Sequence, residues 1–200
     1  MALVDVGDPS SVLWEVRRLV PHRRLEPAED LRTAELQARR LLDLLGVTGP
    51  PVSITEITAL LDIRVTIDHA ARVLIPTEPG WEAGGWHLTV AHVSSRRTRA
   101  VVAHQIKHIL DDQYGSVLYP PTELLTTADR RDRAAAHFSS SLLMPRDWVE
   151  TAWRRGSHTI PAFAKRFGSP EAMVRTRLVA LGLSWPDELR EVSASAPLVG

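Results

Sequence analysis

Two histidines, His104 and His108, have the spacing in this chain that is best suited to chemistry. Side chains four positions apart in a helix point from one face, about one turn from each other, so both imidazoles can reach one metal ion. In zinc hydrolases with this spacing, a glutamate after the first histidine takes a proton from the metal-bound water. Here Gln105 occupies that position, and a carboxamide cannot accept and return the proton. The pattern predicts a metal site without the usual base.

A zinc site of this type needs a third protein ligand. The chain has no cysteine, which leaves His, Asp or Glu. Asp132 is the preferred candidate, because the chain after His108 is long enough to end one helix, form a loop and return in an antiparallel helix. Asp129, one turn earlier, and His137, further along, are secondary candidates. Plainer interpretations are a chance pair of histidines and a solvent-facing charge at Asp132.

Composition restricts the class of protein. Two hundred residues suit one domain with at most a small appendage, and 44% hydrophobic with 24% charged residues are ordinary for a soluble chain. The formal net charge is zero, so no whole-chain attraction to nucleic acid or anionic lipid is expected. We find no signal peptide and no apolar run near the about 20 residues of a membrane span. We therefore expect a cytoplasmic protein with no membrane partner.

Apolar patterning predicts the two helices that must position these residues. The helix with the histidines should cover residues 95–112, and its broad apolar surface makes it central and largely buried. The return helix is predicted over residues 127–143, before Met144-Pro145. Asp111 and Asp112, at the end of the first helix, are expected to face solvent.

The remaining elements form an α+β pattern with a small, mainly antiparallel sheet packed on helices. Helices are expected at 8–20, 30–45, 53–61, 146–155, 159–167 and 170–181, and strands at 63–67, 72–75 and 86–92, with a linker at 21–30 and a loop at 76–85. We divide the chain into an N-terminal extension with one helix (1–30), a main domain (31–156), a helical pair packed on it (157–185) and a loose tail (186–200).

Two motifs taken together identify a resemblance. Residues 103–108, Ala-His-Gln-Ile-Lys-His, followed by residues 132–145, which end in Leu-Leu-Met-Pro, resemble the ImmA/IrrE family of zinc metallopeptidases. The Leu-Leu-Met-Pro ending is the most specific element. The resemblance covers roughly residues 31–183 and implies a compact zincin-like fold.

This resemblance implies a cytoplasmic, zinc-dependent endopeptidase that cleaves a helix-turn-helix repressor. His104, His108 and Asp132 would be the Zn²⁺ ligands, and Gln105 would occupy the general-base position. The chain departs from the family pattern at Gln105, which replaces Glu, and at Asp132, which replaces a ligand Glu. Ala136 also replaces an Asn, and Ala100 replaces a Phe. Asp132 and Ala136 favour natural divergence over an engineered change at Gln105.

Three functions compete on this sequence. The first is a zinc-binding protein of metallopeptidase type that binds or acts on a helix-turn-helix repressor and hydrolyses it poorly. The second is an active zinc endopeptidase, if Gln105 is an engineered change or if another group, such as Asp111 or His137, serves as the base. The third is a DNA-binding transcriptional regulator that uses residues 159–182. Direct DNA binding is the least favoured of the three, because this segment has only a few clustered basic residues: Lys165, Arg166, Arg175 and Arg177.

Overall fold

The computed structural model describes residues 11–21, 23–69, 79–82, 84–91, 94–112, 114–156 and 159–183. The helices are α1 (Val12–Arg17), α2 (Pro27–Leu45), α3 (Ile54–Leu60), α4 (Ser95–Leu110), α5 (Gly115–Leu118), α6 (Thr127–Leu143), α7 (Arg146–Arg154), α8 (Ile160–Phe167) and α9 (Glu171–Ala180). The strands are β1 (Ile63–Asp68), β2 (Gly80–Glu82) and β3 (Gly85–Ala91). The strand expected at 72–75 and the tail at 186–200 lie outside the described residues, as does the start of the helix expected at 8–20.

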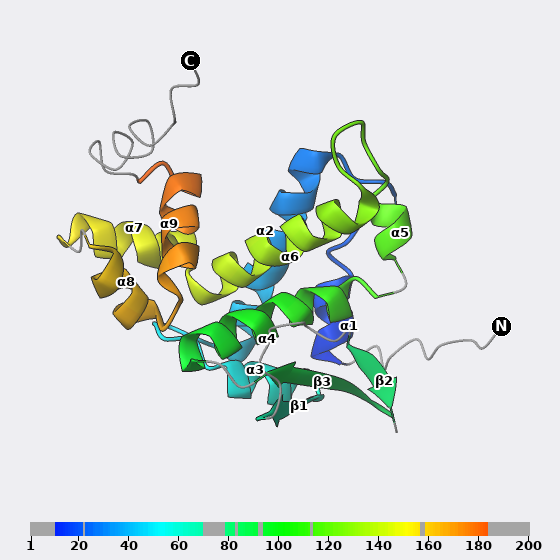
Figure 1. Cartoon of the computed structure of the whole chain (residues 1–200), viewed down its shortest axis with the longest axis horizontal. Helices are drawn as coiled ribbons and strands as arrows, with labels where there is room; N and C mark the ends of the chain where they lie inside the picture. The colour runs from blue at the N-terminus through cyan, green and yellow to red at the C-terminus, as the bar shows by residue number, and fades with distance from the viewer. Residues whose placement is uncertain are drawn as a thin grey trace, which may run out of the picture.

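Three long helices form the centre of the molecule: α4 lies against the sheet, α6 packs on α4, and α2 packs on α6 (Figure 1). Helix α6 has the bounds expected from its apolar pattern, and α4 ends two residues earlier than expected. Small buried side chains on α2 and α6 let these helices approach closely: Ala34, Ala38, Ala134 and Ala135. This packing makes α4 and α6 rigid supports for the side chains between them.

The sheet is mixed, with strand order β1-β3-β2. The longer pairing, from Ile63↔Trp86 to Asp68↔Ala91, is parallel, and β2 pairs antiparallel with β3. The α+β class is confirmed, but the expectation of a mainly antiparallel sheet is wrong. Strands β1 and β3 are too far apart in sequence to form a tight hairpin, and a parallel pair needs such a long connection. Strand β2 also falls within the loop expected at 76–85.

The stretch expected to be a linker, residues 21–30, is packed against the rest of the molecule. Its Leu25 is buried, and the Leu25 amide donates to the Leu118 carbonyl at 3.0 Å. The buried Asp30 carboxylate accepts two hydrogen bonds from Arg130 of α6, both at 2.9 Å. The boundary between an N-terminal extension and a main domain at residue 30 stays a prediction.

Helices α7, α8 and α9 form a second, smaller core at one end of the molecule (Figure 1). The rings of Phe163 and Phe167 stack at 5.9 Å, and Val174 and Leu178 are buried there, as expected for a packed helical pair. Pro170 occupies the N-cap position of α9. None of the helices in the described part of the chain is long and apolar enough to cross a membrane.

Candidate metal centre

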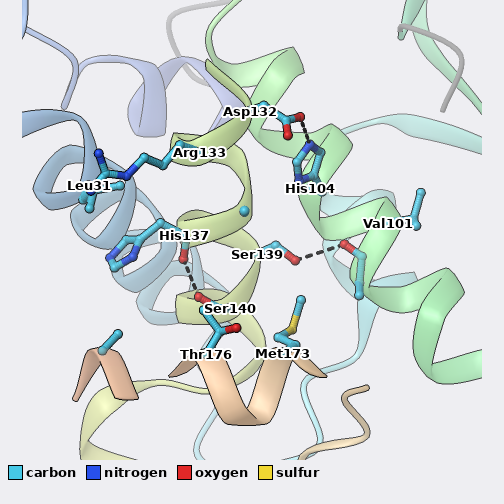
Figure 2. Close-up of a pocket in the computed structure, with 13 residues that line it drawn as sticks. Leu31, Val101, His104, Asp132, Arg133, His137, Ser139, Ser140, Met173 and Thr176 are labelled. Atoms are coloured by element: carbon cyan, nitrogen blue, oxygen red, sulfur yellow. Dashed lines mark hydrogen bonds and ion pairs between the residues drawn. The ribbon is translucent and has the colours of Figure 1, made fainter. Parts of the chain in front are cut away.

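Helices α4 and α6 run antiparallel and bring three candidate ligands together. The Nε2 atom of His104 lies 3.0 Å from Asp132 Oδ1 and 3.1 Å from His108 Nε2. One ligand atom from each residue lies within 4.8 Å of the other two. Figure 2 shows the Asp132 carboxylate reaching from α6 to the His104 ring on α4. The three side chains that the sequence singled out therefore meet at one point.

The donor set fits a zinc ion. Two imidazole nitrogens and one carboxylate oxygen are a known zinc ligand set, and ligands at about 2.1 Å in a tetrahedron lie about 3.4 Å apart. Two of the three separations, 3.0 and 3.1 Å, differ from this by a few tenths of an ångström, and all three lie within 4.8 Å. The Asp132 side chain is 74% exposed, so it is free to adjust. Three protein ligands leave a fourth position open for water or substrate.

Burial disfavours the protonated form of both imidazoles. Burial, together with the electrostatic effects of His104 and Arg131, lowers the pKa of His108 to about 4. Burial also lowers the pKa of His104, against the opposing effect of Asp132. A neutral imidazole has a free lone pair for a metal ion, so no proton has to be displaced at neutral pH.

Gln105 lies beside the two histidines and is almost completely buried, with 3% of its surface exposed. Its Oε1 atom has no hydrogen-bond partner in the described part of the chain. An unpaired buried carbonyl is destabilising by about 1–3 kcal/mol. Gln105 also lines a polar cavity of about 450 Å³ together with all three candidate ligands. Gln105 therefore borders the same space as the candidate ligands.

Behind the centre, α4 carries a buried polar cluster. Lys107 Nζ donates to Asp111 Oδ1 at 2.6 Å and to the Tyr119 hydroxyl at 3.1 Å. The Tyr119 hydroxyl donates to Asp111 Oδ2 at 2.6 Å. The expectation that Asp111 faces solvent is wrong: its side chain is 3% exposed, because Tyr119 and the loop around α5 cover this side of α4. Both Asp111 oxygens are occupied, so this carboxylate is unavailable to the metal centre.

The secondary candidates lie outside the ligand group. Asp129 caps α6, where its carboxylate accepts hydrogen bonds from the amide and hydroxyl of Thr126. His137 lies one and a half turns beyond Asp132, and its Nε2 is 3.7 Å from Glu35 Oε2. The hydrogen bonds of Asp129 with Thr126 and the closeness of His137 to Glu35 account for the positions of these side chains without a metal ion.

Two cavities meet at His104 and Asp132. The polar one contains Gln105, and Arg131 forms part of its wall. The Arg131 Nε atom is buried without a hydrogen-bond partner among the described residues. The other cavity, about 780 Å³, lies between α4, α6 and α9 and is mostly apolar (Figure 2). Arg131 and this second cavity could not be predicted from the sequence, because both depend on which helix faces come together.

Known proteins were compared with this chain. Residues 90–179 match the family model of the peptidase M78 family, IrrE N-terminal-like domain, and this range includes all three candidate ligands. A solved structure described as a Mycobacterium tuberculosis transcriptional regulator matches with a TM-score of 0.58 and 19% identity, over 83% of this chain and 51% of that chain. This chain thus spans about half of that protein, and the likeness concerns the fold alone. No curated protein matches.

Proposed function

We propose that this chain, which carries an IrrE N-terminal-like domain at residues 90–179, is a zinc-binding protein that holds a segment of a helix-turn-helix repressor and hydrolyses it poorly. His104, His108 and Asp132 would hold the zinc ion. Bound zinc would supply a Lewis acid that polarises a peptide carbonyl. The family and the likeness to a transcriptional regulator support a role connected with gene regulation.

The observation that carries this proposal is Gln105, a buried carboxamide in the same cavity as the three candidate ligands. Its side chain has hydrogen-bond donors and an acceptor, so it can orient a water molecule or a peptide group. It cannot take up the proton that hydrolysis releases. Loss of a positioned general base typically slows a reaction by about 10²–10⁴-fold.

An active peptidase would need another base, and the two substitutes considered from the sequence are already engaged. Asp111 is held by Lys107 and Tyr119, and His137 is paired with Glu35. Of the other carboxylates, Asp112 and Asp129 line the polar cavity with Gln105. Asp129 is engaged in the α6 capping box with Thr126, which leaves Asp112 as the residue to test for an active enzyme.

DNA binding by α8 and α9 is the weaker alternative. Arg177, one of the four basic residues that could contact phosphates, is buried, donating to the Met144 carbonyl at 3.1 Å and to Glu35 at 3.0 Å. Lys165, Arg166 and Arg175 are exposed, but three cations on a neutral chain give a small electrostatic footprint.

The test is cleavage of a helix-turn-helix repressor, with the zinc-loaded wild type and Gln105→Glu compared side by side. We expect Gln105→Glu to gain about 10²-fold or more in cleavage rate, with no gain when His104→Ala is added. Surface plasmon resonance should detect zinc-dependent binding of the repressor by the wild type. If the wild type cleaves the repressor at a rate typical of enzymes and Gln105→Glu has the same rate, Gln105 does not impair hydrolysis. Asp112→Asn would then identify or exclude the substitute base.

A further inference from the structure

We infer that the apolar cavity beside the metal centre receives bulky apolar side chains of the protein segment held there. This inference rests on the proposed function, since it names what that site would recognise. His104 and Asp132 line both this cavity and the polar one, so a chain lying across them can place side chains in it. Figure 2 shows His104 and Asp132 at one end of the cavity and Met173 and Thr176 of α9 at the other.

The cavity walls favour an apolar occupant. Small and apolar side chains from four helices line it: Leu31, Ala100, Val101, Ala136, Met173 and Ala180. Several of its polar side chains are already paired within the protein, and the Arg133 guanidinium also lines it. Ser139 Oγ donates to the Ala100 carbonyl at 3.0 Å, and Ser140 Oγ donates to the His137 carbonyl at 2.9 Å (Figure 2). His137 Nε2 lies 3.7 Å from Glu35 Oε2. A polar ligand would therefore lose its own hydration without gaining new partners in these groups.

The size of the cavity indicates more than one side chain. Its volume of about 780 Å³ lies within the range of pockets that hold a whole small molecule, about 300–1,000 Å³. A single leucine or phenylalanine would leave much of it empty. Two neighbouring apolar side chains fit better, as one face of an amphipathic helix in the repressor would supply them.

Helix α9 acquires a role from this arrangement. Met173, Thr176 and Ala180 are spaced by three and four residues, so they share one face of α9, and this face closes the cavity. The opposite side of α9 inserts Val174 and Leu178 into the smaller core. The C-terminal helical pair would therefore contribute to the choice of peptide partner.

The probes are acetohydroxamate and 3-phenylpropanohydroxamate, which share a zinc-binding group and differ in apolar bulk. Calorimetry on the zinc-loaded full chain gives the dissociation constant of each. Burial of the phenyl group should make the second probe bind about 10- to 100-fold more tightly. Ala180→Trp or Ala136→Trp should reduce this ratio toward one, because each fills the cavity. Ala172→Trp, an exposed alanine on α9 outside the cavity lining, is the matched control and should keep the ratio.

The outcomes separate this inference from the proposed function. Equal binding of the two probes by the wild type would overturn the apolar cavity and leave the metal centre intact. An equal fall in the ratio of the two dissociation constants in Ala180→Trp and Ala172→Trp would also overturn the inference about the cavity. Failure of both probes to bind the zinc-loaded chain would overturn the metal centre, and this inference with it.

Discussion

The buried cluster of Lys107, Asp111 and Tyr119 gives a quantitative test of how α4 is held. Lys107→Met removes the cation but leaves the Asp111 carboxylate buried, with only the Tyr119 hydroxyl as a partner. Removing one partner of a buried ion pair typically lowers the free energy of unfolding by about 3–5 kcal/mol. We expect Lys107→Met to lower the free energy of unfolding by that amount, a large share of the about 5–15 kcal/mol of a typical domain.

Removing all three polar groups of the cluster should lower the free energy of unfolding much less than Lys107→Met does. In the triple variant Lys107→Met/Asp111→Leu/Tyr119→Phe, no polar group of the cluster remains unpaired. Replacing buried ion pairs by apolar residues of similar volume is often neutral. We expect the triple variant to lie within about 1–2 kcal/mol of the wild type, so that the three changes are strongly non-additive.

Urea unfolding of the metal-free protein, followed by circular dichroism and tryptophan fluorescence, measures these values. Exposed pairs offer a comparison: Arg39→Met should cost under about 1 kcal/mol, since Arg39 and Asp147 are exposed and 4.0 Å apart. If Lys107→Met is no worse than Arg39→Met, or if the triple variant is less stable than every single variant, the cluster does not hold α4 as described.

Three further predictions concern other buried groups. Burial lowers the pKa of His108 to about 4. Between pH 6.5 and pH 4, His108 is therefore protonated in the unfolded chain but not in the folded chain. The free energy of unfolding of the metal-free protein should thus fall by about 2 kcal/mol from pH 7 to pH 4, with no such fall above pH 7. The urea midpoints of the wild type and of His108→Phe, measured across this range, test this prediction. Gln105→Met removes an unpaired buried carbonyl and should raise the free energy of unfolding by about 1 kcal/mol, measured with urea. Arg130→Met leaves the buried Asp30 without its partner and should cost about 3–5 kcal/mol, measured as a lower melting temperature; an unchanged value would contradict the packed 21–30 stretch.

Long, strongly patterned elements could be predicted from the sequence. Helix α6 (Thr127–Leu143) has its expected bounds, because an apolar stripe, a Thr126 cap and the following Pro145 all agree. Helix spacing also brought His104 and His108 to one face, and the antiparallel return brought Asp132 to them. These features depend on local geometry and on one chain reversal.

Features that depend on distant contacts were missed. Strand β2 has only three residues and is defined by its pairing with β3. The burial of Asp111 depends on Tyr119, which the chain reaches after another turn. An available signal was Lys107, four residues before Asp111 on a helix already expected to be largely buried. The apolar cavity requires α9 to approach α4 and α6, and α9's own pattern does not specify this.

The central claim is that His104, His108 and Asp132 bind one zinc ion. Elemental analysis of the purified protein, after dialysis against a zinc-containing buffer and then a zinc-free one, tests it most directly. We expect about one zinc per chain in the wild type and in His87→Ala, whose histidine lies on β3 outside the ligand group. His104→Ala should contain little or none. No zinc in the wild type, or equal zinc in His104→Ala, would contradict the account.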